Sequence, residues 1–490
     1  MKKNNLTKIS YPLIIIIYFL VTQVPSLIYE VINWDLGTLL SVSRELDRGN
    51  LIYEYQAEGK GPILFYIYNF LIKISNYNIV LIKFFHDLFV LSAALLLYVN
   101  SLKIFNSFTN SLFVSLGFLS FMSVFPYGHS ENWEIFCINF VLIAILIKEY
   151  SRSYDVNLKI VSYFFVGIFL SLSSLVNISS FIFFTPFLFE LIILKTKNRE
   201  KLRYFFASVF GIFLPWLYFI ILYTSNNLLE RFIRYNFTLL YDYSEYNPEF
   251  LNITIENLKL YLIETVILFE NHQIYVHFFT ILLILFIFCK FAIKLPKLES
   301  TFYSILVLSS GLIYFIAQRG YFHHLFFIIC FSSLYFGFIK FPLERNMLIV
   351  IFVINFVIFS NYNFYKINDI LKNFTSLETN YPLYQFVKED ALIPAGDFTV
   401  LGLDHPLIMF YLDKPNVKYY AHVTLKDHVN DDRNQTLEGL LESQPDVIIC
   451  SKTLVETCKL ENKYSYYFST SPQNNTFFYN YDIHYFIKNK

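Results

Sequence analysis

Charged side chains gather between Trp34 and Pro62, directly after the first long apolar segment of a largely apolar sequence. A chain keeps charges beside a bilayer at a cost in free energy, so such groups are candidates for function. A carboxylate can accept a proton from a hydroxyl nucleophile or hold a metal ion, and a lysine or arginine can bind phosphate. The charged residues of this segment are Asp35, Arg44, Glu45, Asp47, Arg48, Glu54, Glu58 and Lys60.

Two shorter polar segments carry further candidates. In the first, Glu131 and Glu134 flank a tryptophan at helical spacing, where a carboxylate can bind hydroxyl groups or a cation. In the second, Arg319 precedes His323 and His324, and a planar guanidinium together with imidazole donors suits a phosphate. We expect these segments and the first one to meet at one face of the membrane.

The composition sets the class of protein. Of the 490 residues 56% are hydrophobic and only 16% are charged, which a soluble domain of this size could not bury, so we predict a polytopic membrane protein. The formal net charge of zero argues against nucleic acid as a partner. The five cysteines match no zinc or redox spacing, and the sequence contains no P-loop, dinucleotide fingerprint or zinc-binding helix.

Apolar runs of lipid length recur along the chain, since a bilayer core needs about 20 apolar residues per helix. They predict about eleven spans. The run at 61–75 is short and interrupted by Asn69 and Lys73, so we interpret it as an interfacial helix lying on the membrane. The predicted spans are 11–33, 79–100, 111–127, 133–148, 160–176, 179–194, 204–224, 273–292, 300–317, 322–340 and 346–365.

Basic residues support this topology. With 61–75 lying flat and the N-terminus inside, every marked basic cluster at the end of a span is cytoplasmic, as the positive-inside bias requires. If 61–75 crossed the membrane, all later clusters would be outside. The same alternation places the segments 34–60, 127–132, 225–272 and 318–321 outside. The longest cytoplasmic segment is then about ten residues, which favours a lipid-borne substrate or one reached from outside.

The composition changes near residue 366. We predict two domains, a transmembrane domain at 1–365 and a small extracytoplasmic α/β domain at 366–490. In the second domain the alternating pattern predicts helices near 381–391, 405–412 and 435–443, strands at 397–403, 417–423 and 446–451, and a terminal pair of aromatic strands. Cys450 and Cys458 lie there and form either a disulfide or two free thiols.

The order of these motifs resembles bacterial GT-C glycosyltransferases of the protein-mannosyltransferase-like and aminoarabinose-transferase-like group. The resemblance covers roughly residues 10–365. It rests on Trp34-Asp35-Leu36-Gly37, Ser43-Arg44-Glu45-Leu46, Gly49, Lys60-Gly61-Pro62-Ile63-Leu64, Pro126 to Glu134, Gly211 to Trp216, Arg234-Tyr235-Asn236 and Gln318 to His324.

The resemblance implies an all-α GT-C-like bundle in the bacterial inner membrane and an inverting transfer of a hexosyl or pentosyl group. The donor is expected to be a polyprenyl-phosphate sugar and the acceptor a glycan, lipid or protein of the cell envelope, with membrane lipids as the surrounding partners. On this reading Asp35 is the base, and Lys60, Arg319, His323 and His324 bind the donor phosphate. Of the two histidines, His324 matches the position of the family histidine.

Glu131 and Glu134 are the expected acceptor or cation site, and Glu134 matches the acidic position of the family. The family commonly has a glutamate where this chain has Leu36, which favours a metal-free base over a two-carboxylate metal site. A divalent cation such as Mg²⁺ or Mn²⁺ on Asp35 and Glu134 stays an open alternative.

Simpler roles and other functions remain as alternatives. Asp35 could cap a helix, Glu131 could lie beside a helix N-terminus, and Lys60 and Arg319 could contact lipid headgroups. A transporter or flippase of lipid-linked saccharides would need charges at mid-membrane, and a polymerase would need a large arginine-rich external loop. The charges cluster in outer loops instead, which favours the transferase.

Overall fold

The computed structural model describes the helical part of the chain and the strands that follow it. All residues outside the following ranges lie outside the described part of the chain. The described residues are 3–28, 34–54, 59–122, 132–194, 196–238, 298–317, 325–336, 367–368, 370–381, 384, 398–401, 410, 447–451, 464–470 and 483–488.

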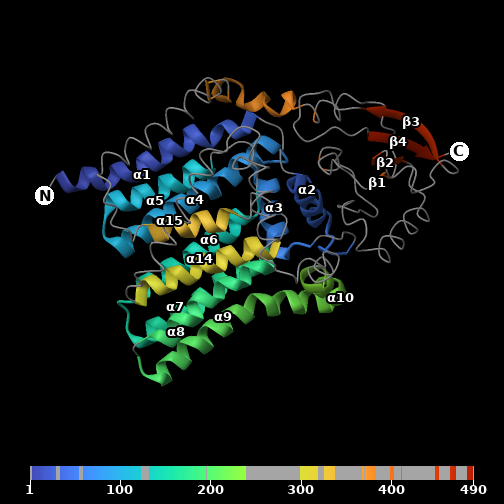
Figure 1. The fold of residues 1–490 in the computed structure, drawn as a ribbon. Helices are drawn as coiled ribbons and strands as arrows, with labels where there is room; N and C mark the ends of the chain where they lie inside the picture. The colour runs from blue at the N-terminus through green and yellow to red at the C-terminus, as the bar shows by residue number, and fades with distance from the viewer. Residues whose placement is uncertain are drawn as a thin grey trace, which may run out of the picture.

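Long helices form the body of the molecule (Figure 1). Every predicted span that falls within the described residues contains a helix, whereas 273–292 and 346–365 lie outside them. Among the described residues, four helical segments are long and apolar enough to cross a membrane: Tyr11–Ile28, Ile79–Phe105, Val156–Val176 and Asn198–Ser225. The helices of the bundle are α1 (Lys3–Thr22), α4 (Ile79–Phe105), α5 (Phe108–Met122), α6 (Glu134–Ser151), α7 (Val156–Val176), α8 (Phe184–Ile193), α9 (Asn198–Ser225), α14 (Leu298–Ala317) and α15 (Leu325–Phe336).

Shorter elements complete the helical part. They are α2 (Trp34–Glu45), α3 (Pro62–Ile74) and α10 (Leu229–Ile233), the 3-10 helices η1 (Val24–Ile28), η2 (Leu46–Arg48), η3 (Ile178–Phe183), η7 (Phe374–Ser376) and η8 (Glu378–Asn380), and a π-helix, η4 (Arg234–Thr238).

The bundle has two distinct ends. The N-terminus of the chain lies at one of them, and α2, α3, α10 and the sheet lie at the other (Figure 1). We call these the N-terminal end and the α2 end. Successive helices run in opposite directions because the turns between them are short: Asn106, in a left-handed conformation, ends α4, and the Asp155 side chain caps α7 at 2.9 Å from the Leu158 amide.

The surface of α9 shows that the bundle faces a non-aqueous surrounding. Phe206, Phe210 and Phe213 are each more than half exposed, as are Tyr218 and Ile221. These side chains recur every three to five residues and therefore line one face of the helix. An exposed apolar stripe of this kind marks a surface that contacts lipid or a partner rather than water.

The helix α3 does not cross the bundle. Its first turn follows Gly61, whose amide donates a hydrogen bond to the Val176 carbonyl at the end of α7. Its last turn leads through Asn78 into the start of α4. Since α7 ends and α4 begins at the α2 end, both ends of α3 lie there, and Figure 1 shows α3 running across the direction of the long helices. The charge pattern of the sequence predicts the same arrangement.

A four-stranded sheet forms the described part of the C-terminal region. Its strands are β1 (Phe398–Leu401), β2 (Val447–Ser451), β3 (Tyr464–Thr470) and β4 (Ile483–Lys488), in the order β1-β2-β4-β3. The strands β1 and β2 pair in parallel, and β4 is antiparallel to both of its neighbours. Both β1 and β2 lie within strands that the sequence predicts, and β3 and β4 are the terminal aromatic pair. Of the predicted helices at 381–391 and 405–412 only Tyr381, Tyr384 and Phe410 are described, and the helix at 435–443, the strand at 417–423 and Cys458 lie outside the described residues.

The segment before the sheet packs on the α2 end. Glu378 accepts hydrogen bonds from Asn78 Nδ2 at 2.8 Å and from the Ile79 amide at 3.2 Å, so a carboxylate lies at the N-terminus of α4. The hydroxyl of Tyr381 donates to the Leu27 carbonyl. These contacts hold the start of α4 and the end of η1 together.

Glycines let α7 and α9 approach closely. A Cβ atom on Gly167 would lie 2.1 Å from the Ser208 carbonyl oxygen, and one on Gly211 would lie 2.1 Å from the Phe164 carbonyl oxygen. Small residues at such crossings allow backbone contact between helices in a membrane.

We expect Gly167→Ala to lower the free energy of unfolding by about 1–3 kcal/mol, because the added methyl group must push the helices apart. Gly117 in α5 is the matched control, since a Cβ there meets nothing within 4 Å. Gly117→Ala should leave the stability unchanged or raise it by up to about 1 kcal/mol. Thermal unfolding of the purified variants in one detergent measures both, and equal changes would contradict the packing described here.

Candidate functional site

The first polar segment folds into α2, η2 and a loop at the α2 end. The structure places Asp35 in the first turn of α2, just after Trp34 at its start. Their side chains lie outside the description. The role of Asp35 as a base therefore stays a prediction. Asp35 lies at the N-terminus of a helix, where the helix dipole stabilises a negative charge.

Asp47 ties α2 to α3. Its carboxylate lies 2.8 Å from Lys73 Nζ and accepts hydrogen bonds from Asn69 Nδ2 and the Tyr77 hydroxyl, each also at 2.8 Å. Asn69 donates a second bond to the Ser43 carbonyl. Burial alone would raise the pKa of Asp47, but the three donors outweigh it and lower the pKa below its usual value.

Arg44 connects α2 to the C-terminal region. Its guanidinium donates a hydrogen bond to the Phe410 carbonyl and lies 4.7 Å from the centre of the Tyr77 ring. The side chain is almost fully buried. The helix α2 is thus held from two sides, toward α3 by Asp47 of the following η2 and toward residue 410 by Arg44.

Tyr53 fastens the loop between η2 and α3. Its backbone has a left-handed conformation (φ 70°), and its ring is fully buried against Tyr223, Phe232 and Tyr235. The Tyr53 hydroxyl donates to the Lys60 carbonyl at 2.6 Å and accepts from Asn236 Nδ2 at 3.0 Å. A tyrosine at positive φ is uncommon, and here the aromatic packing and two hydrogen bonds hold it.

Gly61 fixes the backbone directly after Lys60. Its amide donates to the Val176 carbonyl at 3.0 Å, and a Cβ at this position would lie 1.9 Å from the Leu175 carbonyl oxygen. Any other residue would displace the loop from the end of α7. Pro62 then begins α3 with the backbone angle that a first helical residue needs. The backbone of Lys60 is therefore held by the Tyr53 hydroxyl at its own carbonyl and by the contact of the following Gly61 with α7.

The structure brings Lys60 to the second polar segment. Lys60 Nζ lies 4.8 Å from the centre of the Trp133 ring, which is a cation–π distance. Trp133 is buried and precedes Glu134, the first residue of α6, whose side chain is fully buried. Two candidates from the sequence thus lie next to one tryptophan at the α2 end: Lys60 over its ring, and Glu134 directly after it in the chain.

The remaining candidates cannot be placed. Glu131, Arg319, His323 and His324 lie outside the described residues, so whether they join this site stays a prediction. Within the described residues, no group of three or more His, Cys, Asp or Glu side chains is arranged to hold a metal ion. A cation on Asp35 and Glu134 likewise remains untested.

A buried polar cluster beside this site was missed from the sequence. In the first turns of α4, Lys83, His86 and Asp87 are each at most 4% exposed. Lys83 Nζ donates to the Ser26 carbonyl at 2.9 Å, and the Ser26 hydroxyl donates to Asp87 at 2.9 Å. The spacing i, i+3, i+4 of three ionisable residues inside an apolar run is the signal that could have found them.

This α4 cluster touches the second polar segment as well. His86 Nε2 lies 3.0 Å from the carbonyl oxygen of Asn132, which immediately precedes Trp133. The start of α6, and with it Glu134, is therefore positioned by α4. The α2 end combines a fixed cation and a buried carboxylate, the pair of charges that a phosphate leaving group and a hydroxyl acceptor need.

Comparison with known proteins bears on the fold. No protein-family model matches the sequence, and no curated protein is similar to it in sequence. Among solved structures, ArnT from Cupriavidus metallidurans in the apo state matches with a TM-score of 0.55 and 11% identity, covering 99% of this chain and 98% of that one. The same protein bound to undecaprenyl phosphate matches with a TM-score of 0.58 and 11% identity, covering 97% of each chain.

The chain has the fold of ArnT. The fold expected from the sequence is thus confirmed as an ArnT-like fold, over almost the whole length of both chains. The oligosaccharyltransferase of Archaeoglobus fulgidus, in a complex with Zn and sulfate, matches with a TM-score of 0.48 and 12% identity, covering 96% of this chain and 73% of that one. The likeness to ArnT concerns the fold.

The Asp47 interactions make the stability of the α2 end depend on pH. A carboxylate whose pKa is lowered in the folded state stabilises it above its unfolded pKa, about 3.8, and loses this contribution as the pH falls through the folded pKa. We expect Asp47→Asn to lower the free energy of unfolding by about 1–3 kcal/mol at neutral pH. The difference from wild type should shrink below about pH 4.

Unfolding of both proteins in urea from pH 3 to pH 7 in detergent measures this difference. The matched control is Asp155→Asn, because an asparagine also caps a helix and should change little at any pH. A difference between wild type and Asp47→Asn that stays constant down to pH 3 would show that the three donors do not stabilise the charged form.

Proposed function

We propose that this protein is an integral-membrane glycosyltransferase that moves a sugar from a polyprenyl-phosphate donor to a cell-envelope acceptor. The observation that carries the proposal is the site at the α2 end, where Lys60 is fixed against Trp133 beside the buried Glu134. It is supported by the fold, which is that of ArnT, a protein crystallised with undecaprenyl phosphate.

The proposed reaction is a displacement at the anomeric carbon of the sugar. The acceptor hydroxyl oxygen forms a bond to this carbon, and the bond from the carbon to the phosphate oxygen breaks with its electron pair on the phosphate. The hydroxyl proton goes to Asp35, and the polyprenyl phosphate leaves with one more negative charge. Attack from the side opposite the leaving group would invert the anomeric centre.

Lys60 would stabilise the charge that develops on the phosphate, because a fixed cation in a partly desolvated site lowers the barrier for such a departure. Arg319, with His324 or His323, would complete the phosphate site. Glu134, with Glu131 beside it along the chain, would bind the acceptor or a divalent cation. The basic ends of the predicted spans support the proposal that this end of the bundle lies at the outer face of a bacterial inner membrane, with the N-terminus in the cytoplasm.

The first test compares wild type with Asp35→Asn in purified membranes supplied with radiolabelled polyprenyl-phosphate sugars. Loss of a general base should lower the transfer rate by about 10²–10⁴-fold. Asp155→Asn, at the other end of the bundle, should transfer at the wild-type rate. Equal transfer by wild type and Asp35→Asn would remove Asp35 as the base. Movement of the labelled lipid across the membrane without a new glycosidic bond would instead identify a transporter of lipid-linked saccharides.

The second test concerns the charge of Lys60. We expect Lys60→Gln to lower kcat by about 10²-fold, because one stabilising group at the leaving phosphate is lost. Lys60→Arg should keep much of the activity, since it keeps the charge.

Lys103 supplies a matched control, because its Nζ lies 4.6 Å from the centre of the Tyr150 ring at the N-terminal end. Both lysines lie over an aromatic ring, but only Lys60 belongs to the proposed site. Lys103→Gln should therefore transfer sugar like wild type. An equal loss of kcat in Lys60→Gln and Lys103→Gln would show that the effect comes from cation–π packing rather than from the phosphate.

A further inference from the structure

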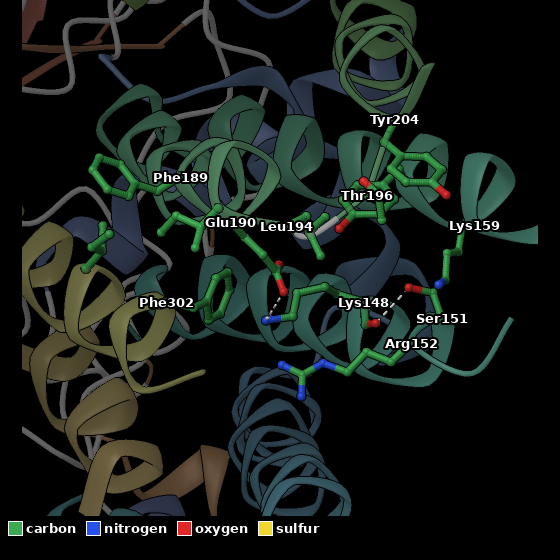
Figure 2. A pocket seen from close by; sticks show the side chains of 13 residues that line it. Lys148, Ser151, Arg152, Lys159, Phe189, Glu190, Leu194, Thr196, Tyr204 and Phe302 are labelled. Carbon is green, nitrogen blue, oxygen red and sulfur yellow. Dashed lines mark hydrogen bonds and ion pairs between the residues drawn. The ribbon is translucent and has the colours of Figure 1, made fainter. Parts of the chain in front are cut away.

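A second polar site lies at the N-terminal end of the bundle, opposite the α2 end. A cavity of about 220 Å³ opens there between α6, α7, α8, α9 and α14. Its polar lining includes Lys148, Arg152, Lys159, Glu190 and Thr196. Figure 2 shows Lys148 and Glu190 pointing toward one another from α6 and α8, with Phe302 of α14 beside the lysine.

Lys148 is the buried centre of this site. Only 1% of its side chain is exposed, and its Nζ lies 3.0 Å from Glu149 Oε1 and 3.4 Å from Glu190 Oε1. Glu149 also binds Arg152 Nε at 2.9 Å and accepts a hydrogen bond from the Tyr303 hydroxyl. Buried charges are costly in a membrane protein, so a network of this kind marks a candidate for function.

Two buried polar atoms of the lining lack a hydrogen-bond partner among the described residues. They are Glu190 Oε2, on a side chain that is 12% exposed, and Thr196 Oγ1. An unpaired buried acceptor destabilises the folded state, and a ligand that donates a hydrogen bond to it would remove this penalty.

Cationic side chains on one side of the cavity suit a phosphate group. The lining and its direct partner Glu149 carry three cationic groups, Lys148, Arg152 and Lys159, against two carboxylates, Glu149 and Glu190. Lys159 forms no ion pair with any described residue. A phosphodiester could therefore pair with Lys159, and a hydrogen-bond donor next to that phosphate would meet Glu190.

The surroundings of the cavity are apolar and exposed. On α8, Phe189 is 45% exposed and Ile192 is 70% exposed, and Leu158 at the start of α7 is 51% exposed. These side chains would contact an acyl chain next to the cavity. The volume is smaller than the 300–1,000 Å³ typical of pockets for larger ligands and suits a small headgroup.

We propose that this cavity binds the headgroup of a phospholipid that carries both a phosphodiester and a hydrogen-bond donor. The phosphate contacts Lys159 and Arg152, the hydroxyl or ammonium of the headgroup donates to Glu190 Oε2, and an acyl chain lies along Phe189 and Ile192. Phosphatidylglycerol and phosphatidylethanolamine share this chemistry. The site is separate from the proposed transfer site and does not depend on the transferase activity.

The test is native mass spectrometry of the full chain in detergent, with defined lipids added. Phosphatidylglycerol or phosphatidylethanolamine should bind at least about tenfold more tightly than phosphatidylcholine, whose headgroup has no donor. In Lys159→Gln and in Glu190→Gln the affinity for the preferred lipid should fall about tenfold, which corresponds to about 1.4 kcal/mol. Lys103→Gln, a cation at the same end outside the cavity, should bind like wild type.

Four results would overturn the proposal. If phosphatidylcholine bound as tightly as the other two lipids, the headgroup donor would not be required. If Lys159→Gln bound the preferred lipid as tightly as wild type, the lipid would bind at a site other than this cavity. Displacement of the lipid by millimolar glycerol 3-phosphate or inorganic phosphate would assign the cavity to a soluble phosphate. Loss of lipid binding in Asp35→Asn would place the lipid at the transfer site, whereas retained binding in an Asp35→Asn protein that transfers no sugar is the expected result.

Discussion

The close approach of Gly61 to the end of α7 is the constraint on which the α2 end depends. The amide of Gly61 bonds to Val176, and a side chain at this position would collide with the Leu175 carbonyl. This single contact fixes where the first polar loop meets the bundle. It also sets the start of α3, so that the helix lies across the long helices instead of passing between them. Lys60 has a defined place because its neighbour has no side chain.

Other contacts reinforce that placement from independent parts of the chain. Tyr53 links the same loop to the end of α9 and to η4 through its buried ring and its bonds to Lys60 and Asn236. Asp47 fastens α2 to α3, and His86 positions the segment that leads into α6. Each contact satisfies polar groups that would otherwise be buried without partners.

Buried charges occur at both ends of the bundle but in different settings. At the α2 end Lys83 and Asp87 are joined through Ser26, and Lys60 lies over an aromatic ring. At the N-terminal end Lys148, Glu149 and Glu190 form a network beside a cavity. The bundle thus carries a polar site at each of its two ends, the one proposed for a departing phosphate and the one proposed for a lipid headgroup.

The sequence by itself determined the helices, their approximate limits and the position of the polar loops between them. These features follow from the length and period of apolar runs and from glycine, proline and capping residues, which act over a few neighbouring positions. It also indicated that 61–75 stays on one side, because basic residues mark the ends of spans. Only the tertiary structure decided that Lys60 meets Trp133, that α4 carries a buried polar cluster, and that α6, α8 and α14 enclose a charged cavity. Such contacts join residues dozens of positions apart, and their formation depends on how whole helices pack, which no local pattern encodes.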